Sequence, residues 1–272
     1  MSILTYIAEA GAKRGRAFSE KIPFAGYTFI TPIGMLFVSC LIVANITAQK
    51  PIHIFFFNLP GGALIFPFLY IIANIVTEVY GYKWTRFLIW ISLLCNILVL
   101  LYTLLTVSLP GASFWSHQAD YQTTLGFVPL IIVASGISYL SGEYVNSYAL
   151  SKLKILMKGR HLWSRVILST AVGSVVDSFV FIPFVFFNTA TLYEMCLLGL
   201  SLSIIKVGYE VLAIPLTYYA VNFLKTAEKS DVYDFNTKFT PFSMDLYYSD
   251  KEKNGATIIQ FKQKSSADSH TA

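Results

Sequence analysis

The fold is decided by residues 63–108, which read ALIFPFLYIIANIVTEVYGYKWTRFLIWISLLCNILVLLYTLLTVS. Two apolar runs, at about residues 63–80 and 86–108, are separated by a short turn that contains Lys83. A helix rising ~1.5 Å per residue needs about 20 mainly apolar residues to cross a bilayer. Backbone polar groups cannot stay unpaired in lipid, so apolar runs of this length are expected to be helices. The stretch therefore predicts two membrane helices joined by a tight polar turn.

The same pattern continues along the whole chain of 272 residues. It is 55% hydrophobic and 13% charged, with a mean hydropathy of +0.60. Soluble proteins carry about 25% charged residues, so this composition argues against a soluble enzyme. We predict an all-α, polytopic membrane protein with six transmembrane helices. They cover about residues 28–48, 63–80, 86–108, 127–150, 165–188 and 196–223.

Lysine and arginine residues mark one side of the predicted bundle. Eighteen of the 20 lie before the first helix, after the last helix, or in the connections that follow the second and fourth helices. Of the other two, Lys50 lies in an opposite connection and Lys206 lies within a helix. The positive-inside rule therefore places both termini in the cytoplasm. We expect a cytoplasmic segment at 1–27, a transmembrane domain at 28–224, and a soluble cytoplasmic tail at 225–272.

Proline and glycine residues interrupt the apolar pattern on the opposite side. Residues 51–62 end in Leu-Pro-Gly-Gly and predict an outer hairpin or re-entrant edge. They lead into a helix that we expect to be broken at Pro67. Broken helices can expose backbone groups to a transport cavity, but a proline kink is also common where helices simply pack. Both interpretations stay open from the sequence.

Five charged residues lie within the predicted helices. Each costs about 2.5–3.5 kcal/mol near a helix centre, so their presence indicates a function. Lys206 and Glu210 are one turn apart and are expected to pair, with Lys206 holding Glu210 in place. Glu78, Glu143 and Asp177 then have no second cation within the helices. We expect them to be protonated, or to meet a transported cation or the N–H donors of a ligand.

Polar side chains recur at helical spacing beside these charges, which predicts an inward polar face on five of the six helices. Carboxylates accept paired N–H donors, amides offer a donor and an acceptor, and aromatic rings stack on flat faces. The set suits a flat heterocycle with a guanine-like edge, although an amino acid or a cation also fits. The candidate substrate-binding residues are Glu78, Glu143, Asn146, Asp177, Glu210, Lys206, Asn45, Gln49, Asn74 and Tyr70.

Small residues also recur at four-residue steps, which is typical of helices that pack closely. Ser169 and Gly173 form such a ladder in the fifth predicted helix, and Ser138 and Gly142 form one in the fourth. We expect these two ladders to bring their helices into close contact with neighbours.

Residues that carry metal or nucleophilic chemistry lack the required spacing. Cys40, Cys95 and Cys196 lie singly in apolar runs, and all four histidines lie outside the predicted helices. No HExxH motif is present, so we predict no catalytic residue, no metal and no cofactor. An intramembrane hydrolase would need a second acid close to Glu78, which makes it the weakest alternative. The basic residues flank apolar runs instead of clustering on a soluble face, so nucleic acid is not an expected partner.

Short motifs along residues 41–224 resemble those of one known family. They are ANITAQK (44–50), FP (66–67), TEVYG (77–81), GEYVNS (142–147), KLK (152–154), DS (177–178), and Lys206 with Glu210. Together they resemble the queuosine precursor transporter family, also named the putative vitamin uptake transporter family. The resemblance covers most of the chain and leaves out the C-terminal tail.

This resemblance implies a secondary transporter in the bacterial inner membrane that acts as a homodimer. Its substrate would be a 7-deazaguanine precursor of queuosine, namely 7-cyano-7-deazaguanine, 7-aminomethyl-7-deazaguanine or queuine, salvaged for tRNA modification. The family commonly has Asp and Gln where this chain has Asn74 and Ser174. The alternative is the substrate-binding membrane subunit of a multi-component, ATP-driven vitamin importer. The chain has no GxxxxGK[ST] loop, so ATP would then have to act through a partner.

Overall fold

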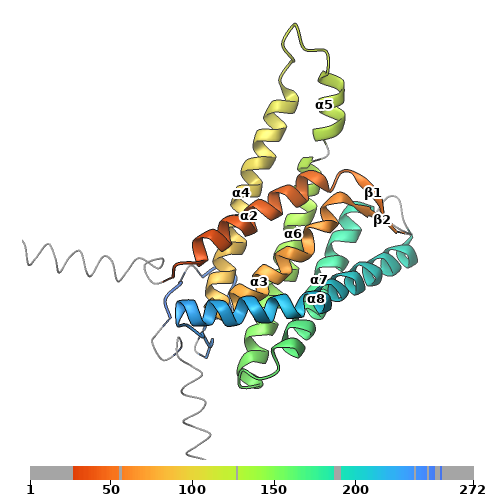
Figure 1. Cartoon of the computed structure of the whole chain (residues 1–272). Coiled ribbons are helices and arrows are strands. Elements are labelled where there is room, and N and C mark those ends of the chain that lie inside the picture. Colours follow the sequence, from red (N-terminus) through yellow and green to blue (C-terminus); the bar gives the residue numbers. More distant parts are fainter. Residues whose placement is uncertain are drawn as a thin grey trace, which may run out of the picture.

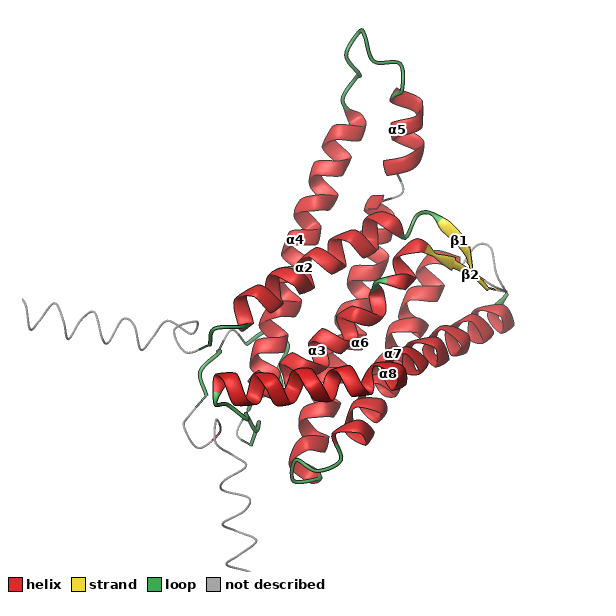
Figure 2. Cartoon of the chain, in the orientation of Figure 1, coloured by secondary structure: helices red, strands yellow, loops and turns green. Residues whose placement is uncertain are grey.

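The computed structural model describes residues 27–54, 57–126, 128–186, 191–235, 237–243, 245–248 and 252. Within these ranges the chain is a bundle of helices with one small hairpin (Figures 1 and 2). This confirms the prediction of a predominantly helical fold. The helices are α2 (Ile30–Thr47), α3 (Phe66–Tyr80), α4 (Tyr82–Ser108), α5 (Gln118–Leu125), α6 (Val128–Leu156), α7 (Leu162–Phe186) and α8 (Leu192–Glu228).

Five of the described helical segments are long and apolar enough to cross a membrane, and they contain α2, α4, α6, α7 and α8. Their outer faces expose large apolar side chains such as Leu98 on α4 and Leu212 on α8, as expected for contact with lipid. The chain is therefore a multi-pass membrane protein. The second predicted helix, 63–80, forms the shorter apolar helix α3.

Helix α3 is short but lies inside the bundle. Its 15 residues extend only about 22 Å, whereas the hydrocarbon layer is about 30 Å thick. Thirteen of these residues are buried, because α2, α4, α6 and α8 all pack against α3. Polar side chains on α3 consequently face protein instead of lipid.

The chain enters α3 through a hairpin and a tight turn. Strands β1 (Pro51–Ile54) and β2 (Phe57–Pro60) pair antiparallel, and the 3₁₀ turn η1 (Gly61–Leu64) follows. The predicted hairpin is confirmed. Pro67, however, does not break a helix, because it lies in the first turn of α3, where a missing backbone N–H costs nothing. The interruption comes earlier, at the change from η1 to α3.

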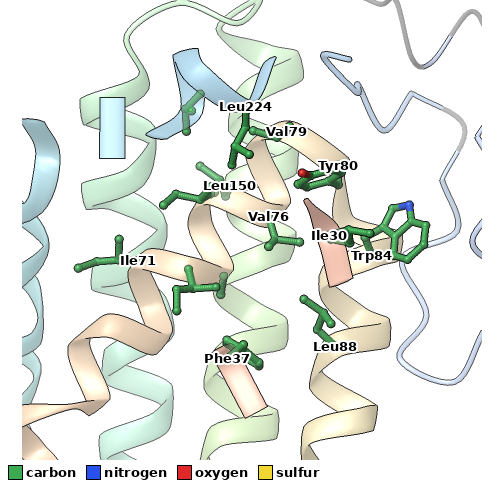
Figure 3. Close-up of a cluster of buried hydrophobic side chains, with 14 of the residues drawn as sticks. Ile30, Phe37, Ile71, Val76, Val79, Tyr80, Trp84, Leu88, Leu150 and Leu224 are labelled. Carbon is green, nitrogen blue, oxygen red and sulfur yellow. The ribbon is translucent and has the colours of Figure 1, made fainter. Parts of the chain in front are cut away.

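Apolar side chains pack around α3 to form the core of the bundle. Figure 3 shows Val76 and Tyr80 of α3 near Ile30 of α2 and Leu88 of α4, all of them buried. Lipid is as apolar as these side chains, so close packing holds the helices together more than exclusion from water does.

Helices α6 and α7 pack closely at two glycines. A Cβ atom on Gly142 would lie 2.4 Å from Asp177 Cβ, and one on Gly173 would lie 2.6 Å from Asn146 Cβ. The small-residue ladders therefore do mark a helix contact, as predicted. The contact also places Asp177 against Gly142 and Asn146 against Gly173.

We expect Gly142→Ala and Gly173→Ala each to lower stability by about 1–3 kcal/mol, because the added methyl group forces the two helices apart. The measurement is the thermal unfolding midpoint of the detergent-purified protein. Gly208→Ala is the matched control, since a Cβ at Gly208 meets nothing within 4 Å. An unchanged midpoint in both interface variants would contradict this packing.

The chain after α8 folds back onto the bundle. Helix α8 continues to Glu228, and the buried residues Val232, Asp234 and Tyr248 then pack against the junction of α3 and α4. This packing of the segment on the bundle was not predicted from the sequence. Sequence composition could not reveal this, because the polar groups of the segment are satisfied by the helix ends that they contact.

This end of the bundle also holds the turn between α6 and α7. Every described Lys and Arg lies there except Lys50 and Lys206. We call it the basic end, and we call the described residues 230–235, 237–243 and 245–248 the strap.

Candidate functional site

A buried polar cluster lies where α3, α6, α7 and α8 meet, and we call it the central cluster. Each helix contributes side chains at three- to seven-residue steps, which places them on one inward face. All are buried except Lys206, which is half-buried. The members are Tyr70 and Asn74 of α3, Glu143 and Asn146 of α6, Thr170 and Asp177 of α7, and Lys206 and Glu210 of α8.

Two amides connect three of these helices. Asn146 Nδ2 donates to Asn74 Oδ1 and to Glu143 Oε1, each at 3.0 Å. Asn74 Nδ2 donates in turn to Thr170 Oγ1 at 3.1 Å. Ser147 adds a second donor to Glu143 Oε1 at 3.2 Å. The central cluster is therefore ordered by its own hydrogen bonds.

Three buried oxygen atoms of the central cluster nevertheless have no hydrogen-bond partner in the described part of the chain. They are Glu143 Oε2, Asn146 Oδ1 and Glu210 Oε1. A buried polar group without a partner costs about 1–3 kcal/mol, so such groups often mark a ligand site. All three atoms are acceptors. The arrangement suits a molecule that presents several N–H donors.

Lys206 pairs with Asp177 on the neighbouring helix and not with Glu210. Tyr70 OH also donates to Asp177 Oδ2 at 3.3 Å. The predicted Lys206–Glu210 pair is therefore wrong. A one-turn spacing permits such a pair, but α7 packs directly against α8 and supplies a closer carboxylate. Among the described residues, Glu210 is left without an ion-pair partner, beside Asn74 and Thr170.

Glu78 lies outside the central cluster, in a group of charges at the basic end. Arg165 Nη1 and Nη2 donate to its two carboxylate oxygens at 2.5 and 3.2 Å. Lys225 Nζ lies 2.8 Å, and Lys154 Nζ 3.6 Å, from Glu78 Oε1. The expectation that no cation neutralises Glu78 is wrong. The three cations come from positions assigned by sequence to the loops and the tail.

The structure also separates Asn45 and Gln49 from the central cluster. Asn45 Nδ2 donates to Asn96 Oδ1, and Ser135 Oγ donates to Asn45 Oδ1, both at 2.7 Å. This second polar group joins α2, α4 and α6. Gln49 lies beyond the end of α2, where its Nε2 donates to the backbone oxygen of Ile46 at 3.0 Å.

Of the ten candidate residues, seven therefore meet in the central cluster, and Glu78, Asn45 and Gln49 lie elsewhere. Thr170 and Ser147 belong beside the seven and were not predicted, because a lone hydroxyl in a membrane helix usually bonds to its own backbone. No group of three or more His, Cys, Asp or Glu residues that could hold a metal is found where side chains are described.

Comparison with known proteins identifies relatives of the chain. Residues 60–220 match the family model described as putative vitamin uptake transporter. The chain is 24% identical over 192 residues to a probable queuosine precursor transporter of Bacillus subtilis, covering 70% of this chain and 83% of the relative. It is 22% identical over 196 residues to the queuosine precursor transporter of Escherichia coli, covering 70% and 86%. No solved structure shows a significant match.

Proposed function

Because the chain belongs to the putative vitamin uptake transporter family, we propose that it imports a queuosine precursor through the bacterial inner membrane. The substrate of this proposal is a 7-deazaguanine base, such as 7-cyano- or 7-aminomethyl-7-deazaguanine, or queuine. It would bind in the central cluster, between α3, α6, α7 and α8.

The observation that supports this substrate most directly is the set of three unpartnered acceptors. A 7-deazaguanine carries N–H donors on its pyrimidine edge, as N1–H and the 2-amino group, and another on its five-membered ring. Acceptors for such donors lie where the four helices meet. They are Glu143 Oε2 and Asn146 Oδ1 of α6 and Glu210 Oε1 of α8. A carboxylate is the strongest acceptor available for this purpose, because charge-assisted hydrogen bonds are about twice as strong as neutral ones.

Two aromatic rings lie beside the Lys206–Asp177 pair of the central cluster and suit a flat ligand. Lys206 Nζ lies 5.8 Å from the ring centres of both Phe66 and Tyr70, next to Asp177. Aromatic faces favour stacking on a heterocycle. Tyr70 and Phe66 are thus the candidates for stacking, and the Lys206–Asp177 pair would orient them.

The basic end faces the cytoplasm in this proposal. Described Lys and Arg residues gather there, and anionic lipids and the insertion machinery retain such residues on the cytoplasmic side. Both termini would then be cytoplasmic. We further propose that the protein works as a secondary transporter and, as the family resemblance implies, as a homodimer, whose mass native mass spectrometry would measure.

We expect ligands with both N1–H and a 2-amino group to raise the thermal unfolding midpoint of the purified protein. The probes are 7-cyano-7-deazaguanine, 7-aminomethyl-7-deazaguanine, queuine and guanine, with hypoxanthine as the matched control that lacks the 2-amino group. A ligand at 100 times its Kd stabilises a protein by about 2.7 kcal/mol. Equal shifts with hypoxanthine, or none with any deazaguanine, would contradict the donor match.

The second candidate, a subunit of an ATP-driven vitamin importer, makes a different prediction. Purified protein in liposomes should accumulate or exchange labelled 7-cyano-7-deazaguanine without any ATPase if it is a carrier by itself. Transport that requires a co-purified ATPase would favour the subunit instead.

A further inference from the structure

The strap is fastened to the junction of α3 and α4 by buried hydrogen bonds. The backbone N–H of Tyr82 donates to Asp234 Oδ2 at 3.1 Å, and that of Lys83 donates to Tyr248 OH at 2.9 Å. Tyr248 OH donates to Asp234 Oδ1 at 2.6 Å. These two backbone donors belong to the first turn of α4, which has no partners within its own helix. The strap therefore caps α4.

Glycine at position 81 allows this close approach. Its φ of +87° lies in the region that favours glycine, and a Cβ there would lie 2.5 Å from Tyr248 OH and 2.7 Å from Val232 Cγ1. The junction is thus shaped to receive the strap.

Side chains of α4 hold the far part of the strap. Arg86 donates to the backbone oxygens of Lys238, Thr240 and Asp245 at 2.9–3.2 Å. Lys83 Nζ pairs with Asp245 Oδ2 at 2.8 Å, and this hydrogen bond holds the pKa of the Asp245 carboxyl below its ordinary value. A loosely associated tail would not have its backbone oxygens bound by a buried arginine.

At its start the strap joins the charge group around Glu78. Asp231, the second residue of the strap, lies 2.6 Å from Lys154 Nζ and 2.8 Å from Lys225 Nζ. Lys154 also donates to the backbone oxygen of Val232 at 2.7 Å. Through Glu78 and Arg165 the group therefore ties together the ends of α3, α6, α7 and α8, the same four helices that form the central cluster.

A file of buried residues on α6 runs between the two clusters. Glu143, Ser147, Ser151 and Lys154 follow one another at three- and four-residue steps, and each is at most 2% exposed. A solute leaving Glu143 towards the basic end would pass along this face, and it would meet the charge group and the strap at the end of α6.

We propose that the strap is the gate that closes the transport pathway at the basic end. The ion pairs of Asp231 with Lys154 and Lys225 hold it closed. This rests on the proposed function, because only a carrier needs its helix ends to part. Asp231 and Glu78 are two carboxylates that balance Lys154, Lys225 and Arg165. When the strap leaves, the three cations share one carboxylate and repel one another. Strap release and separation of the helix ends are consequently coupled.

The test measures access to the pathway without any substrate. Ser151→Cys supplies the reporter, since Ser151 Oγ is buried and makes no hydrogen bond within the described residues. The background carries alanine at Cys40, Cys95 and Cys196. A membrane-impermeant maleimide is applied to inside-out and right-side-out vesicles. Asp231→Asn removes the carboxylate of Asp231, and Tyr248→Phe removes the cap. Each variant is expected to speed labelling from the cytoplasmic side about tenfold, because the closed state loses one charge-assisted hydrogen bond.

Matched controls separate gating from unfolding and from the transport assignment. Asp120→Asn also removes one carboxylate, but from an exposed site on α5, and should leave labelling unchanged. Tyr248→Phe leaves the charge group intact and removes only the cap, so its unfolding midpoint should fall less than that of Asp231→Asn. Unchanged labelling in both strap variants, or equal acceleration from the opposite side, would overturn the gate. Because no deazaguanine is used, a wrong substrate assignment would leave this result as it stands.

Discussion

Glu143→Gln is expected to abolish uptake of 7-cyano-7-deazaguanine while the protein still inserts and folds. The carboxylate is 0% exposed and only one of its oxygens is hydrogen-bonded in the described structure. Glutamine keeps the shape, but it replaces the carboxyl group by an amide whose NH₂ group would face the N–H donors of the substrate. A buried N–H donor left without a partner costs about 1–3 kcal/mol, so binding should weaken by about tenfold.

Two measurements check this prediction. Uptake is followed in cells that cannot synthesise the precursor, by the queuosine content of their tRNA, and stability by the unfolding midpoint of the purified variant. The midpoint should stay near that of the parent, since glutamine keeps the shape and an oxygen that Asn146 and Ser147 can contact. Ser169→Ala is the control, because the Ser169 hydroxyl bonds only to its own helix in the described structure. Normal uptake by Glu143→Gln would refute the central cluster as the substrate site.

Asp177→Asn should also lose uptake, but with a different signature. Its partner Lys206 would be left half-buried without a counter-ion. We therefore expect Asp177→Asn to lower the unfolding midpoint and to lose transport. Glu143→Gln, in contrast, is expected to lose transport only. Identical stability changes in the two variants would contradict this assignment of roles.

Glu78→Gln is expected to destabilise the whole bundle. Arg165 and Glu78 are each 1% exposed, and Lys154 and Lys225 depend on the same carboxylate. Removing one member of a buried ion pair costs about 3–5 kcal/mol, because the other charge stays buried. The measurement is the unfolding midpoint and the yield of folded protein in detergent.

The double variant Glu78→Met with Arg165→Met should recover part of this loss, because it removes both members of the closest pair. Recovery identifies Glu78 as a structural residue at the basic end. If Glu78→Gln instead keeps full stability and loses only substrate-induced stabilisation, Glu78 contacts the substrate, as its position in the sequence first indicated.

Much of the fold was predictable from sequence because the bilayer imposes a local rule. Each long apolar run must pair its own backbone groups, so 86–108 and 196–223 became α4 and α8 within a few residues at most ends. The exception was 63–80, where Pro67 suggested a break. The helix starts at Phe66 instead, because a short helix enclosed by its neighbours has no need to reach both surfaces.

For the central cluster, the sequence indicated seven of the ten candidate residues but not their contacts. Burial in a membrane is costly for Glu143, Asn146, Asp177 and Glu210, and their presence in apolar runs sufficed to single them out. The contacts between these side chains could not be predicted from the sequence in the same way. Helical spacing relates residues on one helix, whereas Lys206 pairs with Asp177 across the contact between α7 and α8.

The sequence by itself thus determined that this chain is a helical membrane protein, which residues carry charge into its interior, and which family it resembles. Hydrophobicity and the free-energy cost of an unpaired charge are properties of each position separately, so both can be recognised from the sequence. Only the tertiary structure decided that Arg165 neutralises Glu78, that Lys206 forms an ion pair with Asp177, and that the polar strap is bound to α4. These outcomes depend on distances between residues 29 to 165 positions apart, which packing alone sets.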